Sequence, residues 1–106
     1  MSRLEKLQEM LALDPGDTFL QYAISMEHKS AGNIEEGEAG FRKLMQNSPP
    51  YVPAFFLLGQ MLAGEDRIDD ARTVLRNGIE QARSQADWHA AGEMSEFLTS
   101  LGELGE

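Results

Sequence analysis

Residues 49–83 read PPYVPAFFLLGQMLAGEDRIDDARTVLRNGIEQAR. The stretch contains two helical patterns separated by one break at Gly64-Glu65-Asp66. Pro53 falls in the first turn of the first helix, where its missing amide hydrogen does no harm, and Asp66 is expected to cap the second helix. Apolar residues cover much of the circumference of the first helix, which is typical of a helix packed on several sides. The stretch therefore predicts a helical hairpin whose first helix is the most buried element of the chain.

Further helices are predicted on both sides of this hairpin, over about residues 2–13, 17–31, 33–46 and 87–101, from apolar residues at helical spacing. Ser2 and Glu5 have the spacing of a capping box, and Asp17 and Asn33 are expected N-caps. Gly37 and Gly40 lie inside a predicted helix, where each costs about 1 kcal/mol relative to Ala. Their presence indicates close approach to a neighbouring backbone.

The two middle hairpins are copies of one design. Shifting the sequence by 34 residues, with no gap, aligns residues of similar type at both turns and at the packing positions. The pairs are Ile24 with Leu58, Ser25 with Gly59, Gly32 with Asp66, Ile34 with Ile68, Glu36 with Asp70, Gly37 with Ala71, Phe41 with Leu75 and Arg42 with Arg76. A partial third copy precedes them, because Leu7, Met10 and Pro15 stand 34 residues before Phe41, Leu44 and Pro49. A period of this length is typical of stacked units that cannot bury their apolar faces alone.

The repeated unit resembles the tetratricopeptide repeat (TPR), whose pattern is a Trp, a Leu-Gly pair, a Tyr, a small residue, a large apolar residue and a closing Pro. In the second unit these positions hold Phe55, Leu58-Gly59, Leu62, Ala71, Leu75 and Arg83. In the first unit they hold Gln21, Ile24-Ser25, His28, Gly37, Phe41 and Pro49. The first unit departs from the pattern at Gln21 and His28, and the second at Arg83.

The resemblance implies an all-α fold, a right-handed α-solenoid of TPR-like helical hairpins, in one domain spanning residues 1–106. Its predicted parts are a half-repeat helix over 2–15, repeats over 18–49 and 52–83, and a capping helix over 86–102. In this last helix His89, Gly92-Glu93 and Phe97 occupy the matching positions. Glu93 would stand where Gly59 stands in the preceding unit and would block the stacking of a further unit.

Composition excludes several classes of function. Nine Lys and Arg against eighteen Asp and Glu give a formal net charge of −9, so nucleic-acid phosphate would be repelled. The absence of Cys excludes a disulfide framework and thiol catalysis. No stretch has the apolar length of a membrane span, and the N-terminus lacks a signal-peptide pattern. A soluble cytoplasmic protein with neither nucleic-acid binding nor membrane insertion is expected.

No catalytic, cofactor or metal site is predicted, and the chain is expected not to be an enzyme. His28 and His89 are the only histidines, and no pattern of a metalloprotease or a hydrolase accompanies them. His28 is expected to be a packing histidine with a hydrogen bond. The carboxylates at the starts of two helices are interpreted as favourable charges in the first turn rather than as cation ligands. They are Glu35, Glu36, Glu38, Asp66, Asp69 and Asp70.

The resemblance also implies where a partner would bind, because the first helix of each TPR unit lines a concave groove. Ten residues of this chain are expected to face such a groove. They are Phe19, Tyr22, Met26, Lys29, Phe56, Gln60, Ala63, Ala90, Met94 and Leu98. The set is largely apolar and contains two adaptable Met side chains. Family members that grip a terminal carboxylate use Lys, Arg and Asn on this surface, and only Lys29 is present here, so that mode is not expected. The expected function is an adaptor for an apolar or amphipathic segment of an unidentified protein, and the alternative is a homodimer or assembly subunit that uses the same surface.

Overall fold

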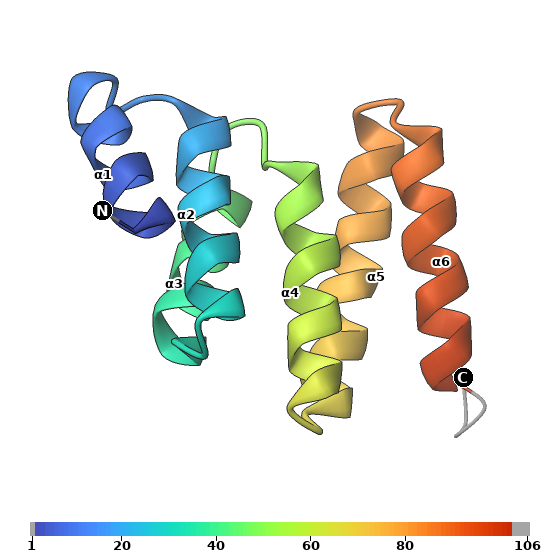
Figure 1. The fold of residues 1–106 in the computed structure, drawn as a ribbon. Coiled ribbons are helices and arrows are strands. Elements are labelled where there is room, and N and C mark those ends of the chain that lie inside the picture. The colour runs from blue at the N-terminus through green and yellow to red at the C-terminus, as the bar shows by residue number, and fades with distance from the viewer. Residues whose placement is uncertain (1, 103–106) are drawn as a thin grey trace. The chain divides into compact units, whose positions relative to one another are not determined.

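The structure, a computed structural model, describes residues 2–102, and all its regular elements are helices. The chain divides into two compact units, residues 1–51 and 52–106. Unit 1 contains α1 (Arg3–Leu13), α2 (Thr18–Ser30) and α3 (Ile34–Met45), and unit 2 contains α4 (Val52–Gly64), α5 (Ile68–Ser84) and α6 (Trp88–Gly102) (Figure 1). Each predicted helix is present, with ends within about two residues of the prediction. The fold is six helices packed sequentially as hairpins, as the TPR resemblance implied.

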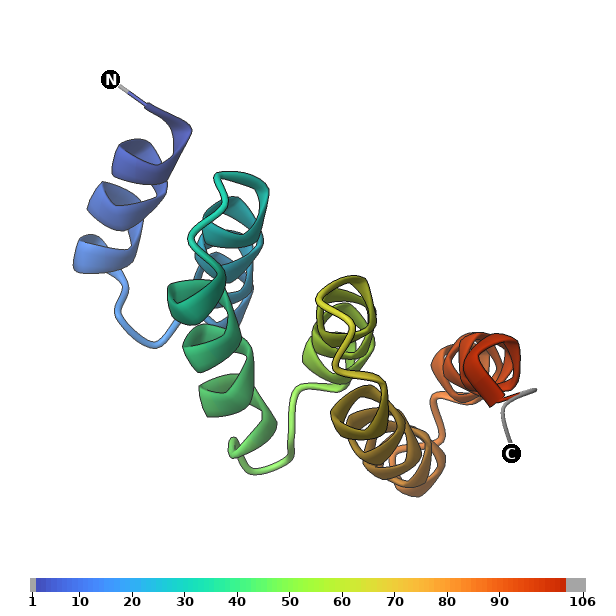
Figure 2. The ribbon, with the colours of Figure 1, turned by 90° about the horizontal axis from the view of Figure 1, so that it is seen from below.

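In unit 1, α2 packs against both α1 and α3, as both ribbon views show (Figure 2). The predicted capping box at the start of α1 is present, because the Glu5 amide donates to Ser2 Oγ and the Ser2 amide donates to Glu5 Oε1. Asp17 caps α2 by accepting from the amide of Leu20 at 3.0 Å. The buried apolar side chains of unit 1 come from all three helices and are Leu7, Leu20, Ala23, Phe41 and Leu44.

Close backbone approach between α2 and α3 explains the two helical glycines. A Cβ on Gly37 would lie 3.3 Å from the backbone nitrogen of Lys29 and from the carbonyl oxygen of Ser25. A Cβ on Gly40 would collide with the hydroxyl of Ser25. The prediction that these glycines admit a neighbouring backbone is confirmed for Gly37, whereas Gly40 makes room for the side chain of Ser25.

In unit 2, α5 packs against both α4 and α6, and α4 also touches α6. Seven of the thirteen residues of α4 are buried, which confirms that this helix is deeply packed. The core of the unit contains large side chains with almost no exposure. They are Leu58 and Leu62 of α4, Leu75 of α5 and Met94 of α6.

Three helices, α2, α4 and α5, are followed by turns of the same conformation. Gly32, Asp66 and Ala86 each adopt a left-handed backbone with φ near +86°, +62° and +60°. In each turn the following amide donates to a carbonyl five residues earlier, as in the bond from Arg67 to Leu62. The prediction that Asp66 caps α5 is wrong, because Asp66 occupies this left-handed position and Arg67 becomes an N-cap without a side-chain bond.

We expect Ala86→Gly to stabilise unit 2 by about 1 kcal/mol, because glycine adopts a left-handed backbone without the steric cost that Ala bears. Ala31→Gly is the matched control, since Ala31 is exposed at a helix end with a right-handed backbone, φ −83°. That control should give no gain. Urea denaturation followed by circular dichroism measures both changes, and equal effects of the two substitutions would contradict the turn assignment.

Gly78 and Gly92 offer a second matched pair within unit 2. A Cβ on Gly78 would lie 2.5 Å from Phe55 Cβ and 2.6 Å from Met94 Sδ, whereas a Cβ on Gly92 would meet nothing within 4 Å. Gly78→Ala should therefore destabilise by about 1–3 kcal/mol through overpacking. Gly92→Ala should stabilise by up to about 1 kcal/mol through helix propensity. Thermal and urea midpoints of the two variants test this, and a stabilised Gly78→Ala protein would refute the close packing of α4, α5 and α6.

Candidate functional site

One face of α2 carries an apolar stripe within unit 1. Phe19, Tyr22 and Met26 follow one another at spacings of three and four residues, which places them on the same side of a helix. The side chains of Phe19 and Met26 are 64% and 38% exposed, and Tyr22 and Lys29 are half-buried. The α2 residues predicted to meet a partner thus include large apolar side chains that this chain leaves uncovered.

Tyr22 is the anchored member of this stripe. Its ring centroid lies 5.9 Å from that of Phe41 and 5.3 Å from that of Tyr51, the latter in an edge-to-face arrangement. Burial raises the pKa of Tyr22 above its ordinary value, and the neighbouring Tyr51 raises it further. Burial also raises the pKa of Tyr51, with an added contribution from the charge of Asp17. Tyr22 therefore supports the fold as well as the surface, so it is a poor position at which to test binding alone.

The two departures of the first repeat from the TPR pattern have local structural roles. Gln21, in place of the Trp, donates from Nε2 to the carbonyl of Pro15 at 2.8 Å and so ties the α1–α2 loop to α2. His28, in place of the Tyr, has its Nδ1 3.3 Å from the side-chain amide nitrogen Nδ2 of Asn33. In the tautomer that carries the ring proton on Nε2, His28 Nδ1 accepts from this side-chain amide. The expected hydrogen bond of His28 is thus present.

Gln21 and His28 both line a cavity of about 370 Å³ in unit 1. Its lining includes Ile24, Ser25 and His28 of α2 together with Gly40 and Lys43 of α3. The cavity lies on a different side of α2 from the apolar stripe, because none of its lining residues belongs to that stripe. Sequence reasoning did not predict it.

In unit 2, a second cavity of about 350 Å³ lies between α4 and α6. Its lining consists of Phe56 from α4 and of Glu93, Glu96, Phe97 and Ser100 from α6. The rings of Phe56 and Phe97 meet edge to face, with centroids 6.1 Å apart and planes at 63°. Of the residues predicted to face a groove on α4, Phe56 alone lines this cavity, while Gln60 and Ala63 are half-buried.

The prediction that Met94 of α6 faces an open groove is wrong, because the register of the helix differs from the expected one. Met94 is fully buried, and its sulfur lies against the α5 backbone at Gly78, so it belongs to the core rather than to an open groove. Ala90 and Leu98 are half-buried. The residues that sequence reasoning missed are those of α6 in the cavity, Glu93, Glu96, Phe97 and Ser100.

The physical reason is the length of α5. The first helices of the two repeats, α2 and α4, begin 34 residues apart, but α6 begins 36 residues after α4. The helix α5 has 17 residues where α3 has 12, while three residues connect α5 to α6 and six connect α3 to α4, so the net shift is two residues. Met94 therefore corresponds to the buried Leu58, and Glu93 does not take the place of Gly59. The idea that Glu93 occupies a helix-packing position is corrected accordingly. The long apolar stripe of α5, which continues through Ile79 to Ala82, was the signal that could have revealed this shift.

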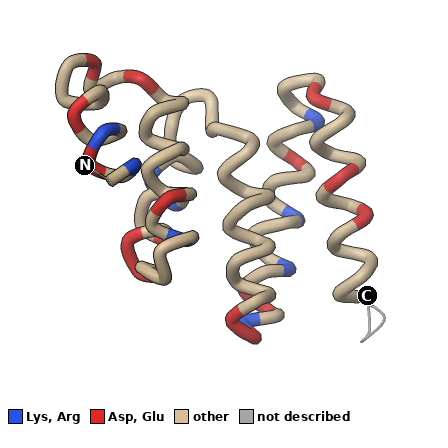
Figure 3. Tube along the Cα trace, in the orientation of Figure 1, with Lys and Arg blue, Asp and Glu red and all other residues tan. Residues whose placement is uncertain are grey.

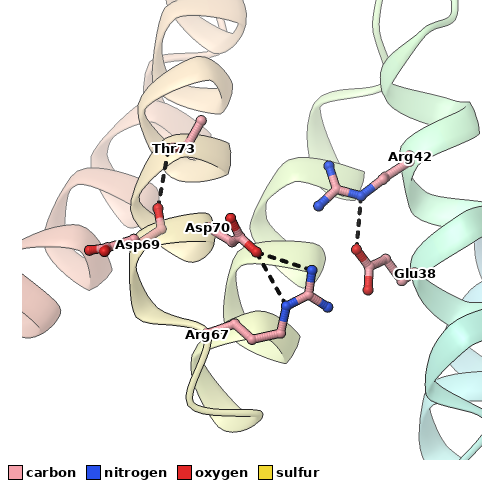
Figure 4. Close-up of polar contacts among 6 residues, drawn as sticks. All are labelled: Glu38, Arg42, Arg67, Asp69, Asp70 and Thr73. Atoms are coloured by element: carbon pink, nitrogen blue, oxygen red, sulfur yellow. Dashed lines mark hydrogen bonds and ion pairs between the residues drawn. The ribbon is translucent and has the colours of Figure 1, made fainter.

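Three of the six carboxylates near helix starts pair with an arginine of the same hairpin, beginning with Glu38, which accepts from Arg42 at 2.9 Å (Figure 4). Asp70 pairs with Arg67 at 3.1 Å, and the carbonyl of Asp69 accepts from the Thr73 hydroxyl (Figure 4). The Asp69 carboxylate pairs with Arg72 at 3.1 Å. Among residues 2–102, no group of three or more His, Asp or Glu side chains is placed to hold a metal ion. Within the same range, no helix combines the length and the apolar character needed to cross a membrane.

Comparison with known proteins places the fold in a family. A solved structure of a tetratricopeptide repeat domain protein from Salinibacter ruber shares 31% identity and a TM-score of 0.80, covering 88% of this chain and 94% of that one. A TPR repeat-containing protein of Pseudomonas aeruginosa is 26% identical over 98 residues, which are 92% of this chain and 93% of that protein. The chain belongs to the TPR family.

Two further similarities are narrower. A solved structure from Bordetella parapertussis, at 23% identity and a TM-score of 0.82, shares the fold over 97% of this chain and 90% of its own. A 57-residue stretch is 39% identical to the cytochrome c-type biogenesis protein CycH of Rhizobium meliloti and covers 54% of this chain but only 15% of that protein. No protein-family model matches the chain.

The raised tyrosine pKa values predict how unit 1 responds to alkaline pH. A folded-state pKa above the unfolded value of 10.0 leaves stability unchanged below pH 10 and lowers it as pH rises further, because the unfolded chain ionises first. Tyr22 and Tyr51 are the only two tyrosines. We expect the wild type to lose more stability between pH 7 and about pH 11 than a Tyr22→Phe, Tyr51→Phe protein, as measured by urea midpoints. Equal losses would contradict the burial of these hydroxyls.

Proposed function

We propose that the protein is a non-enzymatic interaction module that holds an apolar or amphipathic segment of a protein partner, in helical form. TPR domains are in general modules of protein–protein interaction, and the binding mode is our inference. The single observation that carries it is the exposed stripe on α2, where Phe19 is 64% and Met26 is 38% exposed. A helix whose apolar residues recur at three and four residues would match that stripe.

The chemistry of the stripe supports a segment rather than a small molecule. Phe19 offers a large flat apolar surface, and Met26 offers a flexible one that adapts to side chains of different shape. Tyr22 lies between them and is held by Phe41 and Tyr51, so the centre of the stripe is rigid. A rigid centre with an adaptable end suits recognition of an apolar helix face.

A second candidate function is self-association. Met10 and Leu13 of α1 are 51% and 89% exposed, and with Phe19 they place three large exposed apolar residues around the α1–α2 connection. Such residues can mark a surface that pairs with a second copy in a two-fold dimer. In this case sedimentation would show a concentration-dependent dimer.

The experiment compares three proteins as bait in affinity capture from lysate. Phe19→Glu, Met26→Glu alters the stripe at exposed positions and should leave the fold intact. Met10→Glu, Leu13→Glu is the matched control, with the same change in charge at exposed apolar positions off the α2 stripe. A protein captured by the wild type is then purified, and its dissociation constant for all three baits is measured.

We expect the stripe variant to bind the purified partner at least about tenfold more weakly than the wild type, since anchor residues dominate binding energy. The control should bind as the wild type does. If the stripe variant binds normally, or if both variants weaken binding equally, the α2 stripe is not the recognition surface. A wild-type dimer that Met10→Glu, Leu13→Glu dissociates would favour self-association.

A further inference from the structure

Two aromatic side chains, Phe56 and Phe97, line the cavity between α4 and α6. Phe56 and Phe97 pack edge to face, and each is only partly buried, so part of each ring remains accessible. The face of an aromatic ring carries partial negative charge and attracts a cation placed within about 6 Å of its centre. Two such rings at 63° to each other offer a cation more than one approach.

Among the described residues that line the same cavity, two are acidic and none is basic. Glu93 and Glu96 are both exposed and both line the cavity. The helix that supplies Phe56, α4, has no charged residue, and α6 has no Lys or Arg (Figure 3). The four Lys and Arg residues of unit 2, as far as residue 102, lie on α5 or at its N-cap, Arg67. The cavity lining contains no residue of α5.

From this combination we propose that the α4–α6 cavity binds a basic side chain, arginine in preference to lysine, of an amphipathic partner segment. The inference rests on the proposed function and extends it by specifying the charge of the partner. A guanidinium group is planar, so it can stack on an aromatic ring while its N–H groups donate to carboxylates. A volume of about 350 Å³ is at the lower end of the range for ligand sites and suits one side chain.

A group that carries positive charge when protonated lies beside Glu93 on the same helix. His89 Nε2 lies 3.4 Å from Glu93 Oε1, and the His89 side chain is 87% exposed. Because this pair is exposed and the histidine carries charge only when protonated, it is a weak competitor for the carboxylate. His89→Ala should therefore leave binding of an arginine unchanged or slightly stronger.

The net charge argues for a basic partner segment rather than a second copy of this chain. The formal charge of −9 makes two copies repel each other, while a basic amphipathic segment is attracted to the same surface. Attraction by net charge alone would not be confined to α6. The test must therefore distinguish binding at the α4–α6 cavity from attraction by the net negative charge of the whole chain.

The probes are two synthetic amphipathic helical peptides with the same apolar face, one carrying Arg and the other Gln at the flanking polar positions. Their dissociation constants are measured with the full chain by fluorescence anisotropy at low and high salt, and amide chemical shifts locate the contact. We expect the Arg peptide to bind about tenfold more tightly than the Gln peptide. The largest shifts within unit 2 should fall on α6 near Glu93 to Phe97.

Three variants make the assignment specific. Glu93→Gln, Glu96→Gln should abolish the preference for Arg, and Phe97→Leu should reduce it while keeping an apolar side chain. Glu65→Gln, Glu80→Gln is the charge-matched control, because both residues are exposed and neither lines the cavity. That control should keep the preference.

The possible outcomes separate this inference from the proposed function. Equal binding of the Arg and Gln peptides overturns the proposed site for a basic side chain. It does not contradict the proposal that the protein binds an apolar or amphipathic segment. An equal loss in the control variant shows a general charge effect and also overturns the site. If neither peptide binds, both proposals fail. If the α6 shifts appear on concentrating the protein alone, a second copy is the occupant and the inference is wrong.

Discussion

Close approach between helices at small residues is the constraint on which both units depend. Gly37 and Gly40 bring α3 onto α2 in unit 1, and Gly59 lets Leu75 of α5 lie against α4 in unit 2. Gly78 extends the same principle to α6, because it leaves room for Phe55 and Met94. Since side chains in cores are packed at high density, a single methyl group at such a contact displaces a neighbour. The small residues of the repeat pattern are therefore the positions that set the distance between helices.

The shared turn is the second determinant of the architecture. A left-handed residue at Gly32, Asp66 or Ala86 reverses the chain and satisfies carbonyls at the end of the preceding helix. Only one of the three is glycine, so the turn tolerates some backbone strain. The tertiary contacts of the paired helices offset it, because each turn joins helices that pack along their lengths. Local chemistry and helix packing thus act together at each reversal.

The distribution of charge follows from the same packing. The inner face of α5 is apolar, and the basic side chains of unit 2 lie on α5 or at its N-cap. Arg67 pairs with Asp70 of the first turn of α5 (Figure 4), and Arg72 pairs with Asp69. Arg72 also donates to the carbonyl of Leu101 at 3.0 Å and so links α5 to α6. The accessible surface formed by α4 and α6 is left with aromatic rings and two carboxylates. Unit 1 instead presents an uncharged apolar stripe on α2, so the two units offer different chemistry to a partner.

Local patterns in the sequence determined the six helices, the 34-residue register of the two repeats, the capping of α1 and α2 and the role of Gly37 and Gly40. Each depends on residues close together in the chain or on a strict repeat of the same contact. The exposure of Phe19 and Met26 also agrees with the helical period. Only the tertiary structure decided the orientation of α6, because the longer α5 changes the register by two residues and rotates Met94 into the core. That rotation brings Phe97 and Glu93 to Phe56, a meeting of residues about forty positions apart that no local period encodes.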